Sequence, residues 1–118
     1  MTEVIRTADV AVVEEPENDL VMRALASEAD MSVTWVQLAG SHRRLSTARS
    51  TRAYVVLTGA VEIQLGDDRS QNVEAGNVLL VPRGVPYELS GYGTYLVINA
   101  PGFVSGDDEY SAAAETAV

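Results

Sequence analysis

The sequence contains no cysteine and no lysine, and its only histidine is His42. Without cysteine the chain has no disulfide framework and no thiolate metal site. It also lacks any run of about 18 apolar residues, which argues against a transmembrane helix. The first ten residues lack the basic stretch and apolar block of a signal peptide. Together these absences lead us to expect a cytoplasmic protein.

Positive charge is scarce as well. Eight basic residues, all arginine, stand against 17 acidic residues, and the formal net charge is −9. Nucleic acids and anionic membranes are polyanions that a strongly acidic surface repels. We therefore expect neither of them as a partner.

Short apolar runs separated by turn residues fill the middle of the chain, from about residue 31 to residue 100. Within "AVEIQL", the apolar residues Val61, Ile63 and Leu65 alternate with polar ones, as in a strand that is buried on one face. Such runs recur about every ten residues and predict an all-β sandwich or barrel in a single domain. The predicted strands are "MSVTWVQL", "RAYVVLT", "AVEIQL", "NVLLVP", "YELSG" and "TYLVIN", with turn signals such as "GDDRS", "PRGVP" and "GYG" between them.

The two ends of the chain are less regular. The apolar pattern of "DLVMRALASEAD" fits a short helix or a strand, and we favour a strand because everything after it is β. The acidic tail "SGDDEYSAAAETAV" fits a frayed end or a short surface helix. The predicted organisation is an N-terminal strand segment over 1–30, a barrel over 31–103 and a flexible acidic tail over 104–118.

The region over residues 33–101 resembles the cupin family in two motifs. In "GNVLLVPRGVPY", Gly76, Pro82 and Gly84 match the glycine and the Pro-x-Gly of the second cupin motif. The first motif keeps only the glycines at its two ends, Gly40 and Gly59. These residues are turn formers, so they indicate the fold more than the activity. The resemblance implies a cupin double-stranded β-helix, which is a jelly-roll barrel.

The metal ligands of the cupin family are absent from the matching positions. Ser46 and Ala48 replace two histidines, Arg52 replaces the glutamate and Tyr87 replaces the last histidine. A guanidinium stays protonated at any useful pH. It would repel a dication by about 8 kcal/mol at 4 Å and an effective dielectric of 20, twice the value for two unit charges. We therefore expect neither a metal nor another cofactor.

Strand alternation turns Arg52, Tyr54 and Val56 toward the interior of the barrel, with Tyr87 and Ser46 beside them at its mouth. Arg52 would then be a fixed positive charge that holds a carboxylate, a phosphate or an enolate. Its charge would lower the pKa of Tyr87 and make that phenol a general acid or base. In the plainer alternative, Arg52 ends the strand and pairs with Glu88 at the surface, and the two tyrosines only pack.

His42 is the one side chain that normally titrates near neutral pH. It lies in "AGSHRRLSTARS", which we predict to be a polar loop, and it is either an exposed loop residue or a catalytic group at the barrel mouth. The neighbouring arginines of this loop could attract an anionic substrate. Trp35 and Gln37 share one face of an early strand, where they either line the pocket or, for Trp35, form ordinary core.

The resemblance implies a small metal-independent enzyme, because cupins without metal include isomerases and cyclases, some of them in natural-product biosynthesis. The predicted reaction is isomerisation, dehydration or cyclisation of a small oxygenated metabolite, either anionic or enolisable. Tyr87, Arg52 and His42 would be catalytic, and Tyr54, Ser46, Trp35 and Gln37 would bind substrate. The alternative is a cupin module that binds a small molecule without catalysis.

The resemblance also implies a homodimer, because small cupins commonly pair through their sheets. The segment before Met31 would then contribute to the contact. We expect its apolar residues Leu20, Val21 and Leu25 to be exposed for this purpose.

Overall fold

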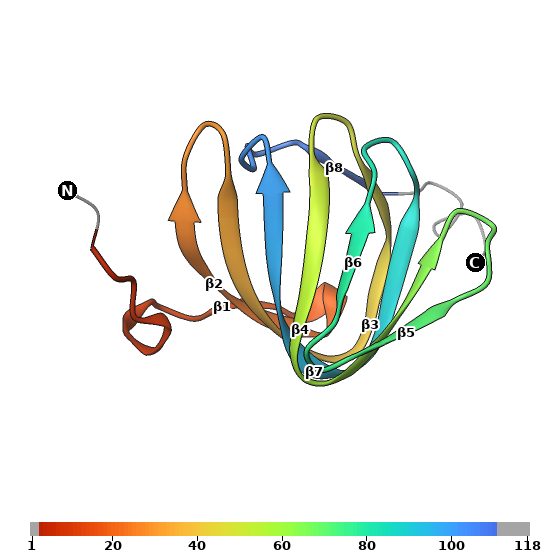
Figure 1. Cartoon of the computed structure of the whole chain (residues 1–118), viewed down its shortest axis with the longest axis horizontal. Coiled ribbons are helices and arrows are strands. Elements are labelled where there is room, and N and C mark those ends of the chain that lie inside the picture. The colour runs from red at the N-terminus through yellow and green to blue at the C-terminus, as the bar shows by residue number, and fades with distance from the viewer. Residues whose placement is uncertain (1–2, 111–118) are drawn as a thin grey trace.

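A computed structural model describes residues 3–110 of the chain. Its strands form one eight-stranded sheet in the order β1-β2-β3-β7-β4-β5, with β6 added to β4 and β8 to β3 (Figure 1). The 3-10 helices η1 (Thr7–Asp9) and η2 (Pro16–Asn18) flank the first strand. The strands are β1 (Val13–Glu15), β2 (Leu20–Ser27), β3 (Ser32–Thr47), β4 (Thr51–Leu65), β5 (Gln71–Glu74), β6 (Val78–Val81), β7 (Tyr87–Ala100) and β8 (Asp108–Tyr110).

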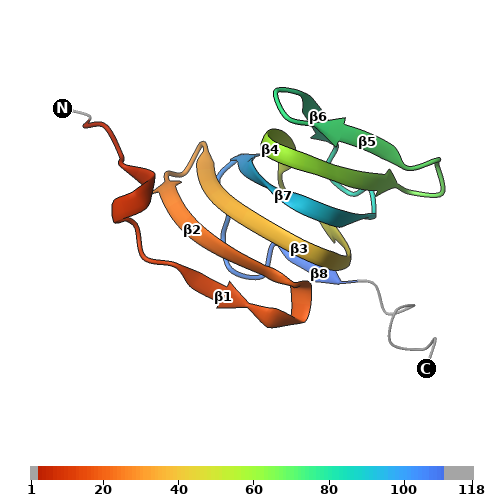
Figure 2. The same cartoon turned by 90° about the horizontal axis from the view of Figure 1, so that it is seen from below.

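Three long strands belong to both walls of the barrel. The first half of β4 pairs with β6 and its second half pairs with β5. In the same way, β3 pairs first with β2 and later with β8, while β7 lies between β3 and β4 along nearly its whole length. The sheet therefore curls over itself: the long strands bend in Figure 1, and Figure 2 shows them from below, lying side by side. This arrangement confirms the predicted all-β double-stranded β-helix.

A row of glycines lets the long strands bend. Gly40 pairs with Gly91 across β3 and β7, and Gly59 pairs with Gly93 across β7 and β4. A Cβ atom on Gly59 would lie 2.2 Å from the carbonyl oxygen of Tyr92. We predicted a turn at "GYG", but these residues lie in the middle of β7. The missing side chains allow adjacent backbones to approach closely at the bend, so here glycine marks a kink within a strand.

Gly59→Ala should destabilise the protein more than Gly76→Ala. Both glycines have positive φ, of 70° and 89°, which costs an alanine about 1–2 kcal/mol. Gly76 has open space where its Cβ would lie, whereas Gly59 faces a backbone carbonyl. We expect overpacking to add about 1–3 kcal/mol at Gly59 alone. Urea unfolding of the two variants measures the difference, and equal losses would contradict the close approach.

The core lies between the two walls and follows the predicted alternation. Val61 and Ile63 are buried and Leu65 packs against them, while Glu62 is exposed. The inward positions of β4 before the bend are buried as well, as predicted. The buried apolar side chains are Leu20, Val36, Leu38, Leu45, Tyr54, Val56, Val61, Ile63, Val73, Val81, Tyr87, Leu89 and Tyr95.

The N-terminal segment forms strand β2, as favoured from the sequence. However, Leu20 is only 7% exposed and belongs to the core, so the expectation that it is an exposed contact residue is wrong. Its side chain alternates inward next to Val36 and Leu38, which are buried on the neighbouring strand. The homodimer itself stays a prediction. Neither helix within residues 3–110 is long and apolar enough to cross a membrane.

The predicted acidic tail begins inside the barrel. Residues 108–110, expected to fray or to form a helix, instead form β8 and pair with the end of β3. Tyr110 pairs with Leu45 and Asp108 with Thr47, so this short strand closes one edge of the sheet. The remainder of the predicted tail, 111–118, lies outside the described residues.

Candidate functional site

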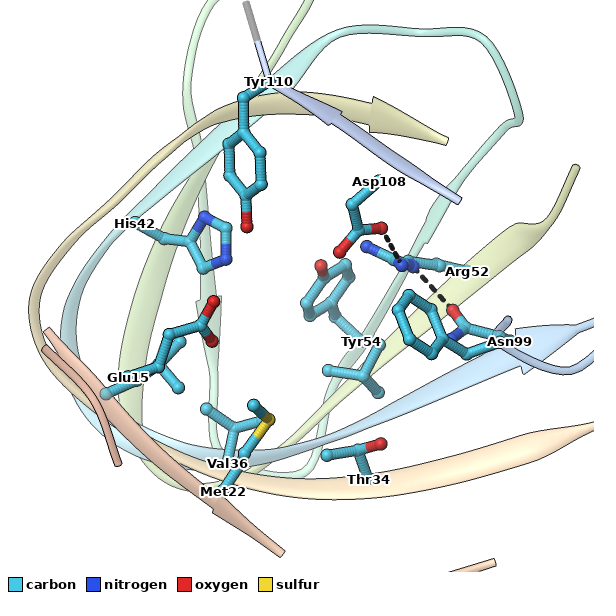
Figure 3. Close-up of a pocket in the computed structure, with 13 residues that line it drawn as sticks. Glu15, Met22, Thr34, Val36, His42, Arg52, Tyr54, Asn99, Asp108 and Tyr110 are labelled. Carbon is cyan, nitrogen blue, oxygen red and sulfur yellow. Dashed lines mark hydrogen bonds and ion pairs between the residues drawn. The ribbon is translucent and has the colours of Figure 1, made fainter. Parts of the chain in front are cut away.

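A cavity of about 180 Å³ lies between the walls near η2 and β8. Its lining combines an apolar floor with a cluster of polar and ionisable groups. Figure 3 shows these polar side chains converging on a common space from several strands. The lining residues are Glu15, Leu20, Met22, Thr34, Val36, His42, Arg52, Tyr54, Val97, Asn99, Phe103, Asp108 and Tyr110.

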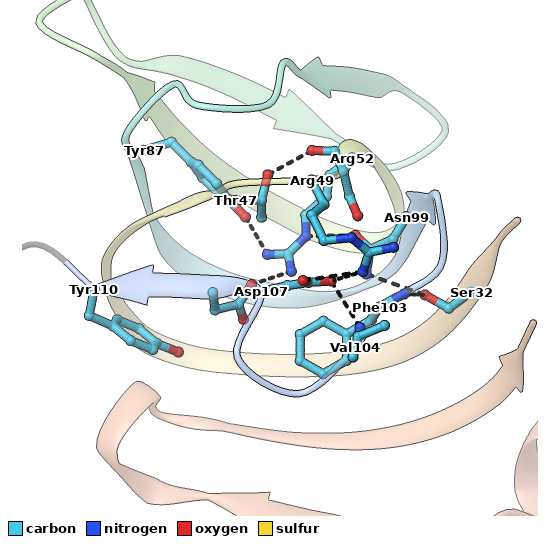
Figure 4. A network of polar contacts seen from close by, with 12 residues as sticks. Ser32, Thr47, Arg49, Arg52, Tyr87, Asn99, Phe103, Val104, Asp107 and Tyr110 are labelled. Carbon is cyan, nitrogen blue, oxygen red and sulfur yellow. Dashed lines mark hydrogen bonds and ion pairs between the residues drawn. The ribbon is translucent and has the colours of Figure 1, made fainter. Parts of the chain in front are cut away.

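Arg52 is buried at the side of this cavity and only 5% exposed. Its Nε donates to Oδ1 of Asn99 at 2.6 Å, and its Nη1 donates to Oη of Tyr87 at 2.8 Å. Its Nη2 donates to Oδ1 of Asp108 in an ion pair. Asn99 lies directly opposite on β7, because the sheet register pairs these two residues. The guanidinium is therefore held on three sides (Figure 4), and Glu88 pairs instead with Arg44.

A chain of hydrogen bonds leads from Arg52 to the cavity through two phenols. The hydroxyls of Tyr87 and Tyr54 are 2.5 Å apart, and Tyr87 is completely buried. Either hydroxyl can be the donor between these two phenols. In the arrangement in which Tyr87 donates to Tyr54, the proton of Tyr54 points into the cavity, which Tyr54 lines. Tyr54, not Tyr87, is thus the phenol that a bound molecule would meet.

Both phenols are protonated at neutral pH. Burial raises the pKa of Tyr87, and the nearby Arg52 guanidinium opposes that effect without reversing it. Burial likewise raises the pKa of Tyr54 well above its ordinary value. We expected Arg52 to lower the pKa of Tyr87 toward the working range, and here the direction is opposite. The loss of hydration outweighs the attraction of the cation, so these phenols are donors and not bases.

His42 lies in strand β3 and not in a loop, and its ring faces the cavity (Figure 3). Its Nδ1 is 2.8 Å from the backbone oxygen of Arg43. A carbonyl oxygen only accepts, so Nδ1 carries the proton and Nε2 is left with a free lone pair. Burial lowers the pKa of His42, which keeps the ring neutral at physiological pH. His42 therefore has the properties of a general base.

One buried amide, that of Asn18 in η2, connects the groups around His42. Its Nδ2 donates to Oε1 of Glu15 at 3.0 Å and to Oη of Tyr110 at 3.1 Å. Its Oδ1 accepts from the backbone nitrogen and from Nε of Arg43, both at 3.0 Å. All four hydrogen-bonding positions of the amide are used, so Asn18 fixes β1, β3 and β8 relative to one another.

Three residues that we predicted to bind substrate do not line this cavity. Trp35 and Gln37 alternate with the cavity residues Thr34 and Val36, so their side chains lie on the opposite face of β3. Trp35 instead packs under the guanidinium of Arg23, whose Cζ is 5.2 Å from the ring centre. Gln37 borders a shallow groove on the outer face. Ser46 is absent from the cavity lining, because it alternates with the buried Leu45 and Thr47.

The donor set at the predicted ligand positions does not fit a divalent cation. Arg52 occupies the interior position where the resemblance would place a carboxylate, and Tyr87 is bound to it. Within residues 3–110, no three His, Asp or Glu side chains are grouped closely enough to hold one metal ion.

Sequence reasoning missed the groups that complete the site. Glu15 and Asn18 come from the N-terminal segment, Asp108 and Tyr110 come from the predicted tail, and Asn99 lies near the end of β7. The alternation of β7 could have placed Asn99 next to Arg52. No local pattern distinguishes Asp108 from the acidic residues around it, because the pairing of β8 with β3 decides its position.

Comparison with known proteins shows the fold but not a family. No protein-family model and no curated protein matches the sequence. Among solved structures, a Streptomyces Pac13 variant with uridine has a TM-score of 0.83 at 14% identity and covers 94% of this chain and 92% of that chain. Pac13 is described as a nucleoside dehydratase.

Two further solved structures have the same fold. KdgF from Halomonas has a TM-score of 0.79 at 14% identity, covering 87% of this chain and 96% of that chain. A protein from Planctomyces limnophilus has a TM-score of 0.81 at 21% identity, covering 93% and 97%. The structural neighbours of this chain, Pac13 and KdgF among them, have the cupin fold. The chain is therefore a small single-domain protein of cupin fold.

Proposed function

We propose that the protein is a metal-independent enzyme that isomerises, dehydrates or cyclises a small enolisable metabolite. One observation carries this proposal: an unprotonated imidazole nitrogen and a phenol that is hydrogen-bonded toward a guanidinium line the same cavity. A base and an oxyanion donor are the two groups needed to remove a proton next to a carbonyl.

The side chains divide the proposed chemistry between them. Nε2 of His42 takes a proton from the carbon next to the carbonyl, and the electrons of the broken C–H bond move to the carbonyl oxygen. The hydroxyl of Tyr54 donates to that oxygen as negative charge develops, and Arg52 polarises it through Tyr87. In a dehydration, those electrons return to form a C=C bond as the hydroxyl on the next carbon leaves, and the protonated imidazole gives that hydroxyl its proton, so water departs. In the isomerisation of a hydroxyaldehyde or hydroxyketone, the neighbouring hydroxyl passes its proton to the former carbonyl oxygen and becomes the new carbonyl. The imidazole then returns its proton to the former carbonyl carbon.

The structural neighbours support the reaction class only at the level of the fold. Pac13 combines a cupin barrel of nearly the same length with a dehydration, so a scaffold of this size can carry such chemistry. A non-catalytic binding module is the second candidate. It is favoured by the fact that all three nitrogens of Arg52 already have partners within the protein.

Deuterium exchange separates the two candidates. Candidate hydroxyaldehydes and hydroxyketones, nucleoside derivatives among them, are incubated with the protein in D2O, and NMR follows deuterium entering next to the carbonyl. In an enzyme, Tyr87→Phe should slow the exchange by about 10²–10³ while binding remains, because it cuts the link from Arg52 to Tyr54. Tyr92→Phe is the matched control, since Tyr92 is 75% exposed. A binding module would bind these compounds without exchange in any form of the protein.

A further inference from the structure

The polar wall of the cavity offers more acceptors than donors. Glu15 and Asp108 both direct carboxylates into the space between the labelled side chains (Figure 3). Nε2 of His42 is a third acceptor, because Nδ1 of the same ring carries the proton. Only Oε1 of Glu15 and Oδ1 of Asp108 have partners among the described side chains, so each carboxylate has a second oxygen for a ligand.

Among the described residues that line the cavity, Arg52 is the one arginine, and its charge is already paired. Nη2 of Arg52 forms an ion pair with Asp108, and its other two nitrogens donate to Asn99 and Tyr87. Within residues 3–110, Glu15 forms no ion pair with an arginine, and His42 is uncharged. Burial raises the pKa of Glu15, and the nearby Arg43, whose Cζ lies 4.0 Å from the centre of the Tyr110 ring, opposes that effect without reversing it. Above that pKa, the two carboxylates that line the cavity face one lining guanidinium. The whole chain adds a background of −9.

We infer that this cavity selects ligands that donate hydrogen bonds through hydroxyl or amino groups and rejects ligands with a carboxylate or a phosphate. An anion would lie near two carboxylates and would need Arg52 to exchange Asp108 for the ligand. A hydroxyl or an amine instead donates to Glu15, to Asp108 or to His42. The inference rests on the proposed function in one respect, that this cavity is the ligand site. It replaces our expectation that Arg52 binds an anionic substrate.

This selectivity is compatible with an enolate-like transition state. The charge on a developing oxyanion appears at one atom, next to the hydroxyl of Tyr54, and a single positioned donor is enough to stabilise it. A carboxylate or phosphate brings a full charge into the cavity before reaction. Asp108 thus disfavours a ligand that is already charged when it binds, while Tyr54 can still stabilise negative charge that develops only during the reaction.

The test uses the single histidine as its reporter. Because the chain has one histidine, the imidazole NMR signals of the intact protein belong to His42 without assignment. In wild type, millimolar inorganic phosphate should leave these signals unchanged at constant pH. In Asp108→Asn, which keeps an acceptor for Arg52 but removes one negative charge, phosphate should bind at least about tenfold more tightly, equivalent to 1.4 kcal/mol. Glu109→Gln, on the exposed face of β8, is the matched control and should behave as wild type.

Each outcome decides the inference. Saturable phosphate binding by wild type at His42 would overturn it, and so would an Asp108→Asn variant that binds phosphate no better than Glu109→Gln. A second titration compares uridine with uridine 5′-monophosphate, and glucose with glucosamine. Tighter binding of uridine 5′-monophosphate than of uridine contradicts the inference. The comparison of glucose with glucosamine shows whether the cavity prefers a hydroxyl or an amino group. These readouts measure binding, so a protein that rejects anions but catalyses nothing would refute only the proposed function.

Discussion

Arg52→Leu should lower the free energy of unfolding by about 3–5 kcal/mol, the cost typical of breaking a buried ion pair from one side. The substitution leaves the Asp108 carboxylate without its cation and the buried Asn99 and Tyr87 each without one hydrogen bond. Leucine fills part of the volume but satisfies none of these groups. Arg52 would therefore be a main determinant of the stability of the site, in addition to any role in catalysis.

Urea unfolding of wild type and variants measures the effect of Arg52→Leu. Arg44→Leu is the matched control, because it breaks the more exposed pair with Glu88 and should cost no more than about 1 kcal/mol. The double variant Arg52→Leu/Asp108→Leu should recover part of the loss, since two apolar side chains often replace a buried pair at little cost. A single Arg52→Leu variant as stable as Arg44→Leu would mean that the guanidinium is exposed to water in solution.

The position of Arg52 could be predicted because it depends on a local rule. Alternation along β4 places every second residue inward, and the apolar pattern on either side of Gly59 fixes which residues these are. The same rule correctly predicted that Tyr54 and Val56 are buried. Alternation cannot identify the residue that pairs with a charged side chain inside the barrel. We proposed Glu88 as the surface partner or a ligand as the interior one, and the structure supplies Asp108 from a strand that we predicted as tail.

The fold was predicted better than the lengths of its strands. Apolar runs and turn glycines predict the correct barrel, but they also predict that strands end at Gly59 and at "GYG". In β4 and β7 the glycines lie inside the strand, where the backbone of a neighbour approaches too closely for any side chain. A glycine at a turn and a glycine at a bend have the same local sequence signature. Only the pairing of Gly40 with Gly91 and of Gly59 with Gly93 tells them apart.

The complete site was beyond the reach of sequence reasoning, for a related reason. Asn18 bonds to Tyr110, 92 positions away in the chain, and Arg52 bonds to Asp108, 56 positions away. Such contacts depend on the closure of the barrel and leave no periodic pattern. His42 illustrates the same point, because its polar surroundings resemble a loop. Its strand is held in place by a buried amide from η2.

His42→Gln should lower the rate of turnover, or of deuterium exchange into substrate, by about 10²–10⁴ while leaving the fold intact. General acid-base catalysis by a positioned side chain typically contributes this much. Glutamine keeps a polar group of similar reach but cannot accept and return a proton. The matched control is Arg49→Gln, on a residue that pairs with Asp107 and does not line the cavity. If His42→Gln turned over substrate at nearly the wild-type rate, His42 would not be the general base, and Glu15 would be the next candidate.

The pH dependence provides an independent check on His42. Burial lowers the pKa of His42 from its ordinary 6.5, so the active neutral ring should persist below that pH and the acid limb of the rate profile should lie there as well. The free energy of unfolding changes in the same direction with pH. The stability contribution of His42 is fully present above pH 6.5 and is lost as the pH falls through the lower pKa that His42 has in the folded state. NMR titration of the one histidine gives that pKa directly. His42→Gln should remove both the acid limb and this part of the stability change, whereas a titration midpoint above 6.5 would show that the ring is hydrated or paired with a carboxylate.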